Sequence, residues 1–222
     1  KKELFKCLQA EKKDSGNIDL RYEVERLNTS QMVIKILINS CYGAMGNKNA
    51  PIGDDDIAAS VTLTGQAVIK QSNEQLKTYI RAQVGEISDH DLEECIVYND
   101  TDSSYISITP LIENGVKFWE DKEKGTIHQE TYDEIQKIED YLNSGMTKWA
   151  EKALLTKDSR FIFKREMIAD IGLFLQKKRY VMHILDDEGI KVNKFKYTGV
   201  EVVRTTMPDA IKPYAKGIIE TM

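Results

Sequence analysis

The chain has 222 residues, 41% of them hydrophobic and 30% charged, so it can form one sizeable core or two small ones and does not have the composition of a disordered protein. No run of about 18 apolar residues occurs, and we expect neither a membrane span nor a signal peptide. The net charge of −5 argues against a uniformly basic nucleic-acid-binding surface. Cys7, Cys41 and Cys95 share no C-x-x-C motif, which predicts reduced, buried thiols and not a disulfide frame or zinc site.

Two helices are predicted before residue 49. Residues 1–13 have the composition of a helix, residues 14–17 that of a turn, and residues 20–44 predict a longer helix that we expect Gly43 and Gly46 to end. Because the turn is short and polar, the two helices are expected to form an antiparallel hairpin. The first residue is not Met and the helical pattern already begins there, so we expect the chain to be part of a larger protein.

Another long helix is predicted over residues 57–82, after a loop at 47–53. Asp54, Asp55 and Asp56 directly precede this helix. Acidic residues at a helix start are explained by capping and by a favourable interaction with the helix dipole. We favour this explanation over a metal site.

The rest of the chain predicts antiparallel strands and further helices. We expect strands at 95–98 and 103–108 joined by a tight turn, a helix at 131–155, strands at 161–169 and 176–185 on either side of Gly172 and Leu173, a strand at 194–203, and a closing helix after Pro208. Residues 186–189 are expected to form an exposed turn. Helices and antiparallel strands in separate blocks predict an α+β fold.

Lys35, Asn39 and Tyr42 fall within a narrow arc of the helix predicted over residues 20–44, because successive helical residues are about 100° apart. A cation can neutralise a phosphate, an amide and an aromatic edge can pack against a base pair, and Gly43 would allow a close approach of the backbone. The alternative is a simple exposed polar stripe on an amphipathic helix. This segment alone does not separate the two interpretations.

Asp100 and Asp102 lie at the tip of the hairpin predicted over residues 95–108. Residues two apart in extended backbone point to the same side, and two carboxylates held together favour a compensating cation. Hard oxygen ligands suit Mg²⁺. The alternative is an ordinary polar turn stabilised by Asp and Asn side chains, and the four residues 99–102 alone fit it well.

Taken together, these segments resemble family B (polymerase-α-like) DNA polymerases. The K-x-x-x-N-S-x-Y-G sequence over residues 35–43 is similar to the family's fingers motif, and the Y-x-D-T-D-S sequence, which begins roughly 55 residues later at Tyr98, is similar to its metal-binding palm motif. The K-K-R-Y sequence at 177–180 resembles the family's K-K-x-Y element, and residues 199–208 resemble the entry to the thumb. The K-K-R-Y form and residues 38–47 are most similar to tailed-phage replicative polymerases.

The resemblance implies a domain organisation. Residues 1–48 would form a helical fingers hairpin, residues 49–203 an incomplete palm with an antiparallel sheet and packed helices, and residues 204–222 the start of the thumb. Lys35 would contact the incoming triphosphate, while Asn39 and Tyr42 would line the nascent base pair, with Tyr42 on its minor-groove side.

The resemblance also assigns roles in the palm. Asp102 would be the principal metal ligand with Asp100 in support, and Glu166 resembles an acidic residue near the metals. The proposed DNA contacts are Lys177, Lys178 and Tyr180 near the primer 3′ end and Arg204 on the duplex backbone. Lys2 and Lys6 would belong to a further phosphate-binding helix.

Two positions depart from the family's pattern. Asn99 stands where the family usually has Gly, and since Asn tolerates the left-handed region, we expect the turn to survive. Lys164 stands where an acid is often found beside the Arg-Glu pair, which weakens the assignment of Glu166.

The family's other metal-binding aspartate, in a D-x-x-S-L-Y-P-like segment, does not occur in these 222 residues, and neither do the proofreading exonuclease acids.

The implied activity is template-directed nucleotidyl transfer from a dNTP to a primer 3′-hydroxyl with two Mg²⁺ ions. The implied partners are primer-template DNA, a dNTP, the remainder of the polymerase chain or a complementing subunit, and a sliding clamp, in the cytoplasm of a bacterial or phage-infected cell. Without the first aspartate motif, the isolated chain is expected to be inactive. The alternatives are a polymerase-derived, non-catalytic DNA-binding module and an unrelated α+β interaction protein.

Overall fold

The computed structural model describes residues 7, 10, 17–157 and 159–221. Most of the helix predicted over residues 1–13 and of the turn after it, including Lys2 and Lys6, lies outside the described residues. The chain divides into two compact units, Lys1–Thr64 and Gly65–Met222.

The first unit contains α2 (Ile18–Met45) and the start of α3 (Asp55–Val84). The side chain of Asn17 caps α2 by accepting from the backbone N–H of Leu20, and Gly46 follows the last turn. The prediction that Gly43 helps to end this helix was wrong, because Gly43 lies within α2 and the helix continues to Met45.

The predicted capping role of the acidic residues before α3 is confirmed for Asp54. Its carboxylate accepts from the backbone N–H groups of Asp56 at 2.9 Å and Ile57 at 3.1 Å. These bonds satisfy donors that a helix start otherwise leaves unpaired. Asp55 forms an exposed ion pair with Lys48 at 2.9 Å.

In the second unit, the long part of α3 packs with α6 (Gln129–Ala153). Buried apolar side chains recur three or four residues apart on both helices, as expected for helices that bury one face. Leu76 and Tyr79 of α3 share a core with Ile138 and Leu142 of α6. The phenol of Tyr79 donates to Glu134 at 2.7 Å, so the polar end of this buried ring has a partner.

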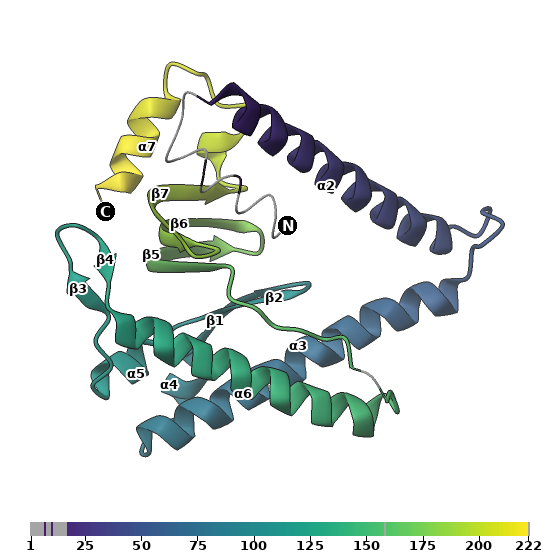
Figure 1. Ribbon diagram of the computed structural model, residues 1–222, viewed down its shortest axis with the longest axis horizontal. Coiled ribbons are helices and arrows are strands. Elements are labelled where there is room, and N and C mark those ends of the chain that lie inside the picture. The colour runs from purple at the N-terminus through teal and green to yellow at the C-terminus, as the bar shows by residue number, and fades with distance from the viewer. Residues whose placement is uncertain (1–6, 8–9, 11–16, 158, 222) are drawn as a thin grey trace. The chain divides into compact units, whose positions relative to one another are not determined.

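Three small antiparallel sheets complete the second unit (Figure 1). Their strands are β1 (Ile96–Asp100) with β2 (Ser103–Ile106), β3 (Trp119–Asp121) with β4 (Thr126–Ile127), and β5 (Met167–Gln176), β6 (Arg179–Asp187) and β7 (Ile190–Thr198), in the order β5-β6-β7. The remaining elements are the short helices α4 (Asp89–Glu94) and α5 (Thr109–Glu113), a 3₁₀ turn at Glu201–Val203 and α7 (Lys212–Glu220). The α+β class is confirmed.

The prediction of two strands, at 161–169 and 176–185, on either side of Gly172 and Leu173 was wrong. β5 runs straight through both residues, and Gly172 pairs with Met182 of β6. The hairpin instead turns at Lys177 and Lys178, where Lys178 has a φ of 61°. Gly172 lies beneath an aromatic ring, because a Cβ there would come within 2.8 Å of the Phe174 side chain, so this glycine serves close packing and not a turn.

Two smaller expectations also need correction. The strand predicted over residues 194–203 begins earlier and ends at Thr198, before the 3₁₀ turn. Cys95 is buried as expected, but Cys41 is exposed on α2.

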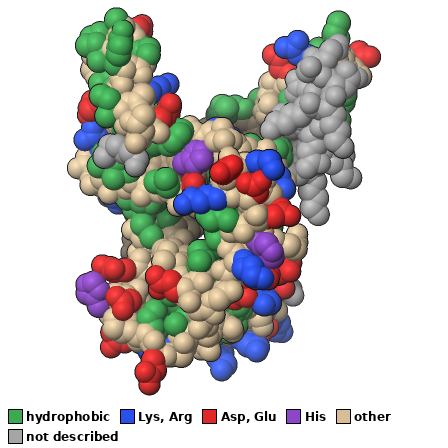
Figure 2. Space-filling view, turned by 90° about the vertical axis from the view of Figure 1, so that its left-hand side faces the viewer, with side chains coloured by type: hydrophobic (Ala, Val, Ile, Leu, Met, Phe, Trp, Pro, Cys, Tyr) green, Lys and Arg blue, Asp and Glu red, His purple; other side chains and the backbone are tan. Residues whose placement is uncertain are grey.

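The described part of the chain contains no helix long and apolar enough to cross a membrane. On the face shown in Figure 2, acidic and basic side chains are interspersed and do not gather into one basic patch.

Candidate functional site

The β1–β2 hairpin carries the two predicted metal-binding carboxylates. Asp100 pairs with Ser103, which leaves Thr101 and Asp102 as the turn. Thr101 has a φ of 50°, and the backbone N–H of Asp102 donates to the carbonyl of Asp100 at 2.6 Å. The left-handed residue is thus Thr101 and not Asn99, which lies within β1 opposite Ser104.

Asp100 and Asp102 have different surroundings. The Asp100 side chain is partly buried and lies 3.9 Å from the Lys178 ammonium, and it accepts from the Thr101 hydroxyl at 3.1 Å. The Asp102 carboxylate is exposed and forms no hydrogen bond or ion pair with any residue that the structure describes. Asp102 therefore offers unengaged oxygen atoms next to a partly engaged carboxylate.

Tyrosine side chains join the hairpin to the turn between β5 and β6. The Tyr98 hydroxyl accepts from the backbone N–H of Lys178 at 2.8 Å, and the hydroxyls of Tyr105 and Tyr180 lie 2.8 Å apart. The second predicted cluster, residues 177–180, is thereby brought directly against the carboxylate hairpin. Of that cluster, Lys177 and Lys178 are exposed, whereas Tyr180 is only 6% exposed.

Glu166 lies just before β5 and is exposed. Burial raises the pKa of Tyr105 above its ordinary value, the hydrogen bond to Tyr180 adds to this rise, and the charges of Glu166 and Asp100 contribute further. Both carboxylates therefore act on the same phenol.

Within the described ranges, the one group of three metal-ligand side chains that converge closely is the exposed set His90, Asp91 and Glu94, which does not include the hairpin.

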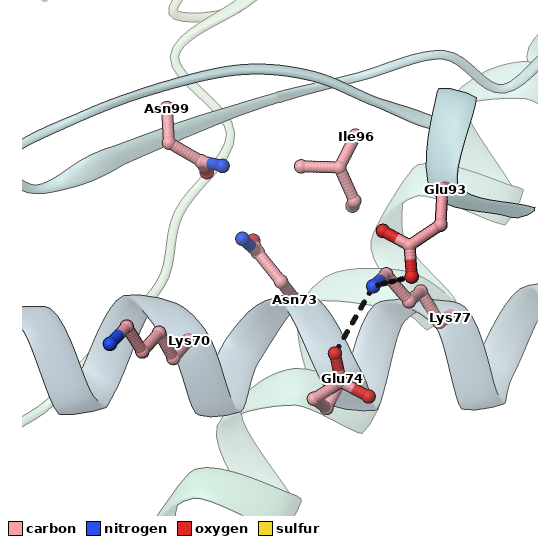
Figure 3. Close-up of a pocket in the computed structure, with 7 residues that line it drawn as sticks. All are labelled: Lys70, Asn73, Glu74, Lys77, Glu93, Ile96 and Asn99. Atoms are coloured by element: carbon pink, nitrogen blue, oxygen red, sulfur yellow. Dashed lines mark hydrogen bonds and ion pairs between the residues drawn. The ribbon is translucent and has the colours of Figure 1, made fainter.

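The other side of the hairpin faces α3 across a cavity of about 510 Å³ (Figure 3). The Ser104 hydroxyl donates to Asn73 of α3 at 3.0 Å, while Oδ1 of Asn99 is buried and has no hydrogen-bond partner among the residues that the structure describes. Lys77 is paired with Glu74 at 3.1 Å and with Glu93 at 2.5 Å, so one cation of the lining is already neutralised. The hairpin thus rests on a polar surface of α3 on one side and on aromatic rings on the other.

The predicted nucleotide-binding stripe lies on α2, in the first unit. Lys35, Asn39 and Tyr42 are all exposed, and the Tyr42 hydroxyl lies 3.5 Å from the carbonyl oxygen of Ala58. Lys35 forms no ion pair with the residues that the structure describes. The apolar residues of this helix segment, including Ile36 at 57% and Ile38 at 63%, are exposed as well.

Arg204, the predicted contact with duplex DNA, follows the 3₁₀ turn and is exposed. It forms an ion pair with Glu201 at 3.1 Å, and the same carboxylate is bonded to Arg179. A phosphate that contacts Arg204 would compete with Glu201 for the Arg204 guanidinium.

Sequence reasoning missed Tyr105 and Asn73 as parts of the site. A signal for Tyr105 exists, since it pairs with Tyr98 across the hairpin and shares its face. No comparable signal marks Asn73, whose contact with Ser104 spans 31 residues of a long helix and a strand.

Comparison with known proteins links these features to one family. Residues 12–222 match the family described as DNA polymerase family B. The chain is 28% identical over 207 residues to a DNA-directed DNA polymerase of Escherichia phage RB69, covering 87% of this chain and 22% of that protein. It is 26% identical over 200 residues to a DNA-directed DNA polymerase of Enterobacteria phage T4, with coverages of 83% and 21%.

A DNA polymerase of Pyramimonas orientalis virus is 26% identical over 198 residues, which covers 88% of this chain and 14% of the viral protein. The chain thus spans about a fifth of the length of the two phage relatives and less of the viral one.

Proposed function

This chain belongs to DNA polymerase family B, and we propose that it supplies the nucleotide-binding fingers helix and one metal-binding motif of the palm to a template-directed DNA polymerase. The observation that supports this most strongly is the 3.9 Å approach of Asp100 to Lys178. It places a carboxylate hairpin suited to cations beside a cationic turn suited to phosphates, although the two motifs are far apart in the sequence.

The proposed reaction is attack of a primer 3′-hydroxyl on the α-phosphate of a dNTP, with pyrophosphate as the leaving group. Mg²⁺, when bound, would supply neutralisation of the charge on the reacting oxygens. Asp102 would be the principal ligand, Asp100 would support it, and Glu166 would add a further carboxylate. The hairpin fits this ion, because Mg²⁺ is commonly held by one or two carboxylates together with substrate phosphates and water.

Lys35, Asn39 and Tyr42 would select and hold the incoming nucleotide. Their exposure on one stripe of α2 and the lack of an ion pair between Lys35 and any residue that the structure describes support this role. Lys35 would neutralise the triphosphate, while Asn39 and Tyr42 would contact the nascent base pair.

Lys177, Lys178 and Arg204 would contact the backbone of primer-template DNA, because all three are exposed cations. Tyr180 is buried and hydrogen-bonded to Tyr105, so we propose that it holds the Lys178 turn in place and does not itself bind the primer.

A complete active site would require the first aspartate motif from the remainder of the polymerase chain or from a complementing subunit, because these 222 residues lack it. The similarity to phage polymerases supports action in the cytoplasm of an infected bacterial cell. A sliding clamp stays an expectation from the family.

Primer extension with Mg²⁺ tests the proposal in the complete polymerase, with the rest of its chain or its complementing subunit present. Asp102→Asn is expected to lower the rate of nucleotide incorporation roughly a hundredfold or more, because the lost stabilisation of charge amounts to several kcal/mol. Asp89→Asn, which changes a 94% exposed carboxylate outside every motif, is the matched control and is expected to leave the rate unchanged.

The isolated chain is expected to extend no primer in the same assay. Full incorporation by the Asp102→Asn polymerase would refute the role of the hairpin. Robust, Asp102-dependent synthesis by the isolated chain would refute the need for a further aspartate motif.

A further inference from the structure

The hairpin β1–β2 contacts the β5–β6–β7 sheet through the side chains of Tyr98, Tyr105, Phe174 and Tyr180. All six pairs of these rings have centroids between 5.4 and 5.7 Å apart, so the cluster is closed. The two strands of the hairpin form a sheet of their own and share no backbone ladder with β5, β6 or β7. A two-stranded hairpin is marginally stable by itself, so its position depends on side-chain contacts with these rings and with α3.

Two hydrogen bonds within this ring cluster join the hairpin to β6 and to the β5–β6 turn. Tyr105 and Tyr180 share a bond of 2.8 Å between their hydroxyls, and the backbone N–H of Lys178 donates to the Tyr98 hydroxyl at 2.8 Å. A buried phenol requires a partner, and the almost fully buried Tyr180 finds it only in Tyr105 among the described residues. Ring packing alone would allow the hairpin to slide, whereas a hydrogen bond fixes the distance between two atoms.

Tyr105 and Tyr180 are linked to the site residues by short stretches of sequence and by strand pairing. Tyr98 is the cross-strand partner of Tyr105 and precedes Asp100 by two positions. Tyr180 follows Lys178 by two positions and lies on β6, directly after the turn. The bond between the hydroxyls therefore acts together with the bond from the Lys178 N–H to Tyr98 in holding the carboxylate tip near the lysine turn.

Burial, followed by the hydrogen bond to Tyr180, raises the pKa of Tyr105 above its ordinary value, and nearby negative charges add to the rise. A tyrosine hydroxyl keeps its proton at neutral pH in any case, and the rise extends this range to higher pH. The hydrogen bond persists over the pH range in which a polymerase would work.

We infer that Tyr105 and Tyr180 are positioning residues, whose shared hydrogen bond holds Asp100 and Asp102 in a fixed relation to Lys178 and so aligns the metal-binding tip with the primer end. The inference rests on the proposed polymerase function. It assigns to each hydroxyl a larger effect on the rate of the chemical step than on the binding of DNA.

Single-turnover incorporation by the complete polymerase tests this with Tyr105→Phe, Tyr180→Phe and the double variant. Each single change is expected to lower the rate of the fast phase about tenfold, because small displacements of reacting groups have large effects on rate. The KM for the dNTP is expected to stay unchanged, and the Kd for primer-template DNA is expected to change by a smaller factor than the rate. The double variant should be no slower than either single one, because both changes remove the same bond.

Tyr141→Phe is the matched control, since this ring packs on Tyr79 in the helical core and lies outside the four-ring cluster. Three results would overturn the inference. The rate of the double variant could fall by the product of the two single effects, or both single variants could keep the unaltered rate. The third is a smaller fast-phase amplitude at an unchanged rate. The smaller amplitude would show that the bond only keeps the protein folded.

Asp102→Asn in the same assay separates the two proposals. If it retains full incorporation, the proposed function fails. If it abolishes incorporation while Tyr105→Phe is as fast as the unaltered polymerase, only the positioning role fails.

Discussion

Lys178 shows how one residue serves the site through both its backbone and its side chain. It adopts a φ of 61° at the β5–β6 turn, a region that side chains other than glycine enter at a cost. Its backbone N–H donates to Tyr98, and its ammonium lies 3.9 Å from Asp100. The contacts that hold this backbone also direct the side chain toward the carboxylate hairpin, so a glycine here would relieve the turn but remove the cation.

His183 joins all three strands of the larger sheet. Its ring nitrogens lie 2.7 Å from Asp170 of β5 and 2.6 Å from Asn193 of β7, and its ring packs on Phe195 at 4.7 Å. Burial lowers the pKa of His183, but the hydrogen bonds to Asn193 and Asp170 and the charge of Asp170 outweigh it, so the pKa is raised above 6.5. The charged ring donates to both neighbours.

The stability of this sheet is therefore expected to depend on pH. Because the folded pKa lies above the unfolded value, the contribution of His183 is complete below pH 6.5 and is lost as the pH rises through the folded pKa. Hydrogen exchange of the β5–β7 amides in the complete polymerase, corrected for intrinsic rates, should show less protection at pH 8 than at pH 6. His183→Gln should remove this difference and His90→Gln, at an exposed histidine, should not. Equal pH dependence in the unaltered and His183→Gln proteins would contradict the prediction.

At the scale of elements, α2 is a helix that carries Lys35, Asn39 and Tyr42, the residues proposed to bind the nucleotide. Helical spacing alone places Lys35, Asn39 and Tyr42 on one face, and the structure shows all three exposed on a single helix. Gly43 continues this helix and does not end it, which places the stripe inside regular structure and not at its frayed end.

Lys35→Ala is expected to raise the KM for the dNTP about tenfold or more in the complete polymerase, because a hydrogen bond to a charged group contributes roughly 1.5–3 kcal/mol. The Kd for primer-template DNA without nucleotide should stay unchanged. Lys152→Ala, at an exposed lysine of α6, is the matched control. Steady-state incorporation at varied dNTP concentration measures the effect, and an unaltered KM would remove Lys35 from the nucleotide site.

Elements with strong local signals could be predicted, and those decided by distant contacts could not. The cores of α2, α3, α6 and the carboxylate hairpin follow from periodicity and turn residues. Gly172 was wrongly placed between two strands, because the reason for a glycine there is the ring of Phe174, a packing contact within β5 that the sequence does not show. The short helices α4 and α5 and the two-residue strand β4 carry too few residues for a periodic pattern.

The same limit applies to the candidate site. Short motifs identify Asp100, Asp102 and Lys178 one by one, but nothing local shows that they meet. The bond between Tyr105 and Tyr180 joins residues 75 positions apart, and only the fold brings them together.

At the scale of the whole molecule, the two parts of the chain that carry the predicted site residues lie in different compact units. The stripe of α2 belongs to the first unit, and the carboxylate hairpin with the Lys178 turn belongs to the second. Each part has a surface suited to a different portion of the substrates: a cation and an aromatic edge for the nucleotide, and carboxylates beside lysines for metal ions and the primer. Their joint action requires the polymerase as a whole.

Metal-directed cleavage tests the central claim, that the β1–β2 hairpin is a metal-binding part of a polymerase site, most directly. Fe²⁺ binds divalent-cation sites and, with ascorbate and peroxide, produces radicals that cut the nearby backbone. In the complete polymerase bound to primer-template DNA and a dNTP, we predict cleavage near Asp100 and Asp102 that excess Mg²⁺ suppresses and that Asp102→Asn removes, while Asp89→Asn leaves it unchanged. Cleavage that avoids the hairpin, or that persists undiminished in the Asp102→Asn protein, would contradict the claim.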